Sequence, residues 1–204
     1  MSTSTRTTVR TAGVALRAML VFTLVLGVGY TLLITGIGQL ALPWQANGSL
    51  LTDGRGATVG SALIGQSFTD ADGAALPGYF QSRPSAAGDG YDGGASGGSN
   101  DGPENPDLVS AIGDRQATIS ELDSVAVAGI PADAVTASAS GLDPHISPAY
   151  ALLQVPRIAA ARGIPESAVR TLVEQHIQQR DLGYLGEPRV NVLQLNIAVD
   201  VLGR

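Results

Sequence analysis

Hydrophobic and polar positions divide the chain into an apolar segment and a domain of mixed polarity. Residues 19–42 form a run of 24 residues without a charged side chain. As a helix this run is ~36 Å long, enough to cross a hydrocarbon core of ~30 Å with some tilt. A cleaved signal peptide has a shorter apolar core of ~7–15 residues. The pattern predicts a transmembrane helix at residues 14–42, after a disordered Ser- and Thr-rich leader at residues 1–13.

Apolar positions in residues 43–204 follow both helical and strand-like periods. Helices are predicted at 107–123 and at 148–162, the latter with Ser147 as its N-cap. A third helix, from Pro165, has a predicted buried face of Val169, Leu172, Val173, His176 and Ile177. The remaining predictions are a short strand with its turn at 61–68, an extended segment at 79–86 and a Gly-rich loop at 88–106. A further strand is predicted at 189–199, with a bulge where its alternating pattern slips by one residue. The predicted fold class is α+β, with one N-terminal transmembrane helix followed by a single small soluble α+β domain.

Small and polar residues recur at every fourth position of the apolar segment. On a helix such residues form a slowly drifting stripe, which lets membrane helices approach closely and form hydrogen bonds. The stripe predicts a face for a partner helix, although Gly and Thr are also common in membrane helices without a partner. The predicted face consists of Thr23, Gly27, Thr31, Thr35 and Gln39.

The distribution of charge predicts which side of the membrane each part occupies. Arg6, Arg10 and Arg17 precede the apolar run, and the next positive charge is Arg55. By the positive-inside rule, the N-terminus is cytoplasmic and the domain is extracytoplasmic. All 18 acidic residues but only 9 of the 12 arginines follow Leu42, so this part has a formal charge of −9. Such a domain repels nucleic acid.

Two residue types are absent, which excludes several kinds of chemistry. The chain has no cysteine and no lysine, because all 12 of its basic residues are arginine. Disulfides, thiol catalysis and cysteine-based zinc sites are therefore excluded. A Walker P-loop and a Schiff-base enzyme both require a lysine and are excluded as well.

Three short patterns resemble catalytic motifs. Residues 88–93 match G-x-G-x-x-G and residues 94–98 match G-x-S-x-G, but neither has the flanking strand and helix that these motifs need. Asp143, His145 and Ser147 suggest a triad or a metal site, yet each proline that follows Asp143 or Ser147 favours a local role in a turn or cap. We therefore predict no catalytic and no metal-binding residues. A tethered hydrolase using Ser96 or Ser147 stays as a minor alternative.

Six segments in this order resemble one family over nearly the whole chain: GSALIGQSF, YFQSRPSA, SGGSNDGPENP, VTASASGLDPHISP, QVPRIAAARG and EPRVNVLQLN. The family is that of the C subunit of the bacterial potassium-transporting P-type ATPase, the Kdp system. The chain departs from the usual family pattern at Asp101, where Leu is common, and at Ala139, where Gly is common. The motif residues with an expected structural or interface role are Arg83, Ser96, Gly97, Gly98, Asn100, Asp143, His145, Ser147, Arg189 and Asn191.

The resemblance implies a non-catalytic accessory subunit in the cell membrane, needed to assemble an ATP-driven potassium uptake complex. Its implied partners are a channel-like potassium-selective subunit and a P-type ATPase subunit, besides membrane lipid. The family has also been described as a catalytic chaperone that raises the ATP affinity of the pump subunit through a ternary complex with nucleotide. An extracytoplasmic acidic domain without a P-loop does not fit that alternative, so the residues predict no directly bound cofactor. The resemblance alone suggests ATP as a ligand.

Overall fold

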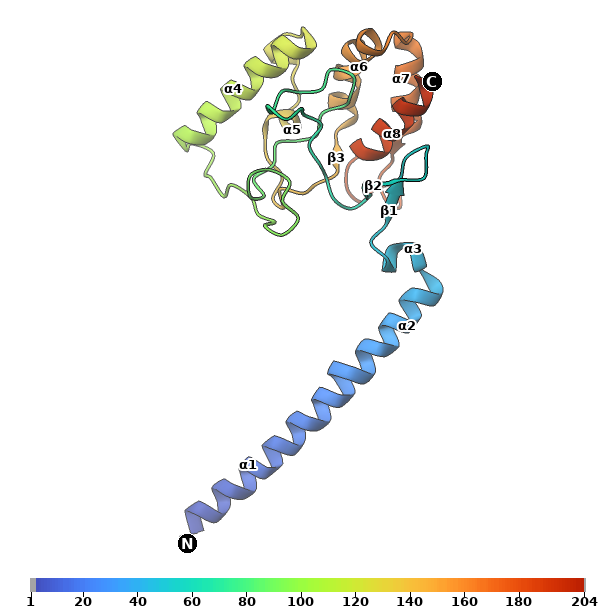
Figure 1. Cartoon of the computed structure of the whole chain (residues 1–204). Coiled ribbons are helices and arrows are strands. Elements are labelled where there is room, and N and C mark those ends of the chain that lie inside the picture. The colour runs from blue at the N-terminus through green and yellow to red at the C-terminus, as the bar shows by residue number, and fades with distance from the viewer. Residues whose placement is uncertain (1–2, 204) are drawn as a thin grey trace. The chain divides into compact units, whose positions relative to one another are not determined.

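The computed structural model describes residues 3–203 and divides into two compact units, Met1–Ser49 and Leu50–Arg204 (Figure 1). The predicted fold class is confirmed: one apolar N-terminal helix precedes a domain of helices and small sheets. Because the positions of the two units relative to each other are not determined, each is described separately.

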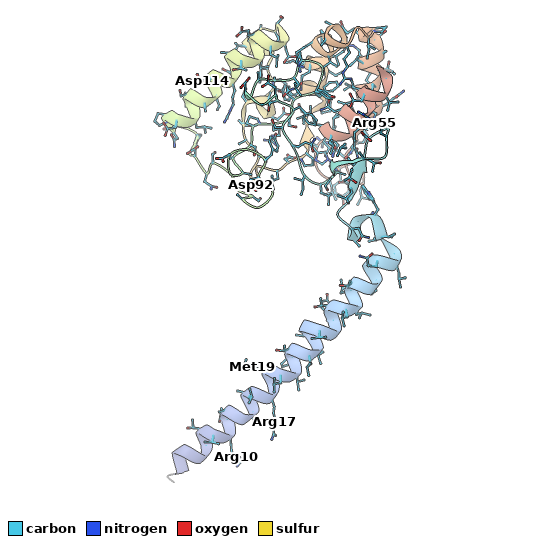
Figure 2. All side chains as sticks on the ribbon, viewed as in Figure 1. Arg10, Arg17, Met19, Arg55, Asp92 and Asp114 are labelled. Atoms are coloured by element: carbon cyan, nitrogen blue, oxygen red, sulfur yellow. The ribbon has the colours of Figure 1, made fainter. Side chains whose placement is uncertain are left out.

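The first unit is helical. It consists of α1 (Thr3–Phe22), the π-helical segment η1 (Thr23–Tyr30), α2 (Thr31–Ala41) and the short α3 (Pro43–Ala46). Residues 7–41 are long and apolar enough to cross a membrane, by length and composition. Arg10 and Arg17 precede Met19 along the helix (Figure 2).

The predicted disorder of the leader at residues 1–13 is wrong for the described residues. The helix begins at Thr3, and Met1 and Ser2 lie outside the described residues. Extending an existing helix adds one hydrogen bond for each residue fixed and needs no new nucleation. The polar leader can therefore continue as helix from the apolar segment without a separate nucleation step.

The described residues of the second unit form four α-helices of ten or more residues, one short α-helix, and the 3-10 helix η2 (Val127–Gly129). The α-helices are α4 (Pro106–Asp123), α5 (Ala132–Val135), α6 (Pro148–Arg162), α7 (Glu166–Gln175) and α8 (Val192–Leu202). Side chains cap three of them: Asn105, Ser147 and Asn191 accept hydrogen bonds from backbone N–H groups in the first turns of α4, α6 and α8. Each cap pairs an N–H group that has no partner within its helix. The predictions of α4 and α6 are confirmed.

Two small antiparallel sheets complete this unit. β1 (Leu50–Thr52) pairs with β2 (Thr58–Ser61), and the second sheet has the order β3 (His145–Ile146), β5 (Arg189–Asn191), β4 (Ile177–Gln178). In the second sheet, Ile146 and Ile177 face Val190 from either side. The strand predicted at 61–68 is wrong beyond Ser61, because the chain continues as irregular structure.

The strand predicted at 189–199 is wrong after Asn191. There the chain turns into α8, whose buried Val192, Leu195 and Val199 are spaced by three and four residues. The break in the alternating pattern, which suggested a bulge, is thus the start of helical periodicity. The Asn191 side chain accepts the N–H of Gln194 at 3.1 Å and fixes the change from strand to helix.

The core lies between the helices of the second unit. α6 packs against α7 and α4, and α7 packs against α8, while α4 lies apart from α7 and α8 (Figure 1). Fully burying one such aliphatic side chain contributes about 1.5–3 kcal/mol. The large aliphatic core residues include Val155, Ile158, Val169, Val173, Val190, Leu195 and Val199.

Two buried amides hold the predicted extended segment at 79–86 to this core. The Asn196 side chain accepts the N–H of Phe80 at 2.8 Å and donates to its carbonyl at 3.0 Å. Gln154 makes the same pair of bonds with Gln81, at 2.7 and 3.2 Å. Each side-chain amide forms the two hydrogen bonds that a neighbouring strand would form in a sheet. The N–H and C=O groups of Phe80 and Gln81 are therefore paired although the segment belongs to no sheet. This arrangement fixes the position of Arg83 a few residues later.

Candidate functional site

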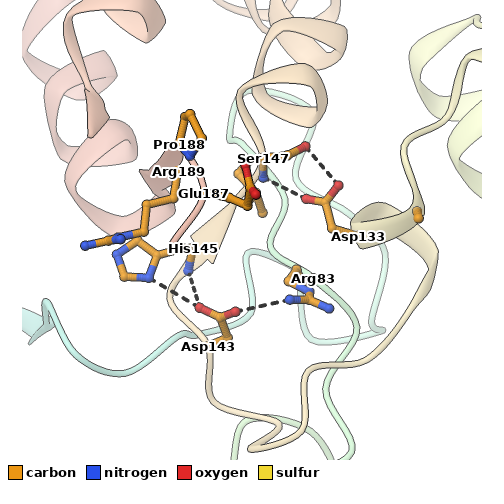
Figure 3. A pocket seen from close by; sticks show the side chains of 10 residues that line it. Arg83, Asp133, Asp143, His145, Ser147, Glu187, Pro188 and Arg189 are labelled. Carbon is orange, nitrogen blue, oxygen red and sulfur yellow. Dashed lines mark hydrogen bonds and ion pairs between the residues drawn. The ribbon is translucent and has the colours of Figure 1, made fainter. Parts of the chain in front are cut away.

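The family-motif residues on either side of β3 gather around one hollow of about 740 Å³ (Figure 3). The hollow forms because β3 pairs with β5, and the extended segment and α5 bring further side chains beside it. Its charged and polar lining consists of Arg83, Asp133, Asp143, His145, Ser147, Glu187 and Arg189. Of these, Asp133 and Glu187 were not among the predicted site residues.

Asp143 is the centre of one hydrogen-bonded group in the hollow. Its Oδ1 accepts the backbone N–H of His145 at 2.9 Å and lies 3.3 Å from the His145 Nδ1. Its Oδ2 pairs with the Arg83 guanidinium at 3.2 Å. Burial alone would raise the pKa of Asp143, but the hydrogen bonds of His145 and the nearby Arg83 charge outweigh it and hold that pKa below its usual value. Asp143 therefore stays ionised and fixes both neighbours.

Ser147 belongs to a second group. Asp133 on α5 accepts the Ser147 hydroxyl at 2.8 Å and the Ser147 backbone N–H at 2.7 Å. The same hydroxyl oxygen accepts the N–H of Tyr150 at 3.1 Å and caps α6. A catalytic triad would direct the serine proton to the histidine, whereas here it is directed to Asp133. The local role predicted for Asp143 and Ser147, in a turn and a cap, agrees with these bonds.

The Gly-rich loop is tied to the segment before β3. The Ser96 hydroxyl and the Gly97 N–H both donate to the Ser140 carbonyl at 2.9 Å. Gly98 lies so close that a Cβ there would stand 3.0 Å from the Ala139 carbonyl oxygen. Asn100, at a φ of 56°, donates to the Gly98 carbonyl at 3.0 Å. These four motif residues therefore shape the loop and lie outside the hollow.

Gly141 shows how closely the loop and this segment approach. It has a φ of +67°, and a Cβ there would stand 2.6 Å from the Ala87 nitrogen and 2.7 Å from the Gly97 oxygen. Both the backbone conformation and the space exclude any other residue without a shift of the loop.

Burial raises the pKa of Tyr91, whose hydroxyl donates to the Arg83 carbonyl, to about 12.

The last two motif residues lie on β5, directly before α8. The Arg189 guanidinium lies 3.5 Å from the Asp181 carboxylate. Asn191 is 2% exposed, donates to the Ala62 carbonyl at 2.9 Å and caps α8. Asn191 therefore has a structural role, whereas Arg189 lines the hollow. No group of three or more His, Asp or Glu side chains in residues 3–203 is arranged to hold a metal ion.

Comparison with known proteins identifies the family. The family model described as "K+-transporting ATPase, c chain" matches residues 12–201. The "Potassium-transporting ATPase KdpC subunit" of Caulobacter vibrioides is 54% identical over 187 residues, covering 91% of this chain and 90% of that protein. The chain belongs to the KdpC family. The KdpC subunit of Gemmatimonas aurantiaca is 56% identical over 198 residues, covering 92% of both chains. That of Geobacter metallireducens is 50% identical over 189 residues, covering 92% of this chain and 96% of that protein.

The resemblance seen in the sequence is thus confirmed, and the two departures from the usual KdpC pattern have local explanations. Asp101 accepts the Asn105 side-chain amide at 2.9 Å, and Asn105 caps α4. Ala139 is exposed, so its methyl group is accommodated at the surface. Neither residue lines the hollow.

The small and polar stripe of this KdpC-family chain crosses η1 and α2. In an α-helix each four-residue step overshoots a turn by about 40°. A π-helix, whose hydrogen bonds close over five residues, winds more loosely, so the same step falls short of a turn. Successive stripe positions therefore rotate around the helix axis in one direction from Thr23 to Thr31 and in the opposite direction from Thr31 to Gln39. The two rotations offset each other, so the five positions stay on one face. The Gln39 side chain pairs with that of Asn47 at 3.0 and 3.4 Å.

The partners of the motif residues were not predicted from the sequence. Asp133 had one signal: it follows Pro131 by two residues, and an acidic residue in a first turn is typical of a helix start. Asp181 begins a turn that its pairing with Leu185 closes, and Glu187 follows that turn. The sequence does not reveal this pairing.

Proposed function

We propose that the chain is the membrane-anchored, non-catalytic C subunit of a potassium-transporting ATPase, needed to assemble or stabilise its channel-like and P-type ATPase subunits. The observation that carries this proposal is the match over residues 12–201, which joins one apolar helix to the domain within a single family. The relatives are named as subunits of a potassium-transporting ATPase, which implies a complex of several chains.

The helix of residues 14–42 provides the anchor in this proposal. Its N-terminus is cytoplasmic and the domain is extracytoplasmic, because Arg6, Arg10 and Arg17 all precede the apolar run. The face of Thr23, Gly27, Thr31, Thr35 and Gln39 packs on a helix of a partner subunit. The π-helical segment supports this assignment, because it keeps the stripe on one side over its full length.

A non-catalytic role is supported by what the polar side chains of the hollow already bind. The Ser147 hydroxyl serves Asp133 and the cap of α6, and Asp143 holds Arg83 and His145. Neither serine named in the hydrolase alternative has a histidine among the partners described for it, since Ser96 donates to the Ser140 carbonyl. These groups therefore stabilise the domain.

The orientation separates this proposal from the nucleotide-chaperone alternative, because a domain outside the cell has no contact with cytoplasmic ATP. The chain has no cysteine, so Ser99→Cys in the exposed part of the Gly-rich loop provides a single reporter. In intact cells that express the whole complex, we expect a membrane-impermeant maleimide to label this cysteine. Labelling only after lysis would refute the orientation and favour the chaperone alternative. A denatured lysate checks that the thiol reacts at all.

Assembly is tested in the same cells with an affinity tag on the P-type ATPase subunit. We expect the full-length chain to co-purify with that subunit in mild detergent, and the channel-like subunit to be lost from the complex when the chain is deleted. A chain that elutes alone, with the other two subunits still associated without it, would contradict the proposed role.

A further inference from the structure

An exposed apolar turn lies between β4 and β5. Leu182, Tyr184 and Leu185 are 82%, 69% and 48% exposed, and Leu182 is the most exposed large apolar side chain among the described residues of the domain. Isolated surface leucines are common, but three large exposed apolar side chains within four residues are a local concentration of apolar surface. We call these three side chains the apolar knob.

The backbone of the knob is closed by hydrogen bonds, whereas its side chains are in solvent. The Asp181 and Leu185 backbones exchange two hydrogen bonds of 2.9 Å, which close the turn. Gly183 and Gly186 have φ values of 82° and 75°, and Leu182 has a φ of 53°, which is unusual for a residue with a side chain. A turn closed in this way loses little further backbone freedom on binding, so the backbone of the knob is preorganised for a partner.

The knob continues directly into the hollow described above. Glu187, Pro188 and Arg189, which follow it in the chain, form one wall of that hollow. Arg180 pairs with Glu187 and Asp181 pairs with Arg189 across the base of the knob, so these charges offset one another. An apolar centre next to a hydrated polar rim is the usual composition of a protein–protein interface, where tyrosine is a frequent anchor.

We propose that the apolar knob inserts into an apolar pocket of another subunit of the same ATPase, with basic side chains of that subunit facing the hollow. The inference rests on the proposed function and identifies the partner surface of the domain. The domain has a formal charge of −9, which disfavours both anionic lipid headgroups and a second copy of this chain. The hollow has two arginines against three carboxylates, so it favours a basic neighbour.

The first test compares variants in the complete complex, purified through a tag on the P-type ATPase subunit. The double variant Leu182→Ser, Tyr184→Ser should reduce co-purification at limiting concentration at least tenfold, because losing a central anchor often weakens an interface by more than that. Val109→Ser on α4 is the matched control, since Val109 is also exposed, at 56%. Undiminished recovery of the double variant would overturn the inference. If the unaltered chain itself failed to co-purify, the proposed function would be wrong and the inference with it.

The second test identifies the occupant directly and does not depend on loss of binding. Tyr184→Cys introduces the only cysteine, which is labelled with a benzophenone maleimide and irradiated in the intact complex. We expect an adduct with the mass of this chain plus one other subunit, and a weaker one from the same label at Ser99→Cys. An adduct of twice the chain's mass, or a product with lipid alone, would overturn the inference.

Discussion

Replacing Asn196 by Ala tests whether buried amides hold the extended segment at 79–86 in place. The Asn196 side chain is the partner of both backbone groups of Phe80, at 2.8 and 3.0 Å. Asn196 is 2% exposed and Phe80 is fully buried, so water does not reach this contact. The alanine variant leaves one N–H and one C=O group without these partners inside the core.

The expected loss follows from the cost of those two groups. A buried polar group without its hydrogen bond costs about 1–3 kcal/mol, so the pair costs about 2–6 kcal/mol. Small domains have unfolding free energies of about 5–15 kcal/mol. Asn196→Ala should therefore remove a large part of the stability of the domain.

Urea unfolding of the full-length chain in mild detergent, followed by circular dichroism, measures this loss. With a slope of about 2 kcal/mol per molar urea, the midpoint should fall by about 1–3 M. Gln175→Ala, at an exposed position of α7, is the control and should change the free energy of unfolding by less than about 0.5 kcal/mol. If Asn196→Ala behaved like this control, the two hydrogen bonds would not hold the segment and the account of the fold would be wrong.

Two further predictions concern the site and use the same unfolding assay. Gly141→Ala should destabilise the domain by at least about 2 kcal/mol, since its Cβ would stand 2.6 Å from a backbone nitrogen. The control Gly102→Ala, with no atom within 4 Å, should have little effect. Asp143 has a lowered pKa when folded, so its ionised form stabilises the domain above the ordinary aspartate pKa of about 3.9, and this contribution is lost as the pH falls through the folded pKa. The difference in unfolding free energy between the unaltered chain and Asp143→Asn should therefore narrow below about pH 4; a constant difference would contradict the assignment.

Local signals in the sequence were sufficient for several elements. The run without charges predicts the apolar helix, and the proline after Ser147 predicts both the N-cap and the first residue of α6. Residues 107–123 agree with α4 apart from one residue at its start. In each case the stabilising contacts are within the segment itself, so its own residues determine the outcome.

Other elements depend on contacts between distant segments, and the sequence does not reveal these. β5 is a strand because β3 and β4 pair with it, and the chain leaves the sheet where the Asn191 side chain caps α8. The strongly β-forming residues of α8 are helical because the helix buries Val192, Leu195 and Val199 on one face. The hydrogen bond between Ser147 and Asp133 forms because α5 lies beside the start of α6. The motif therefore identified Ser147 but not its partner.

The distribution of the motif residues has a structural cause. Residues 62–105 form no helix or strand, apart from one isolated bridge, so their backbone groups need partners from elsewhere. Several motif residues belong to these long-range contacts: Asn191 donates to Ala62, Ser96 donates to Ser140, and Asp143 holds Arg83. Side chains bound in this way already serve the fold. The side chains of the apolar knob are exposed instead, which favours the knob over these motif residues as the central contact with another subunit.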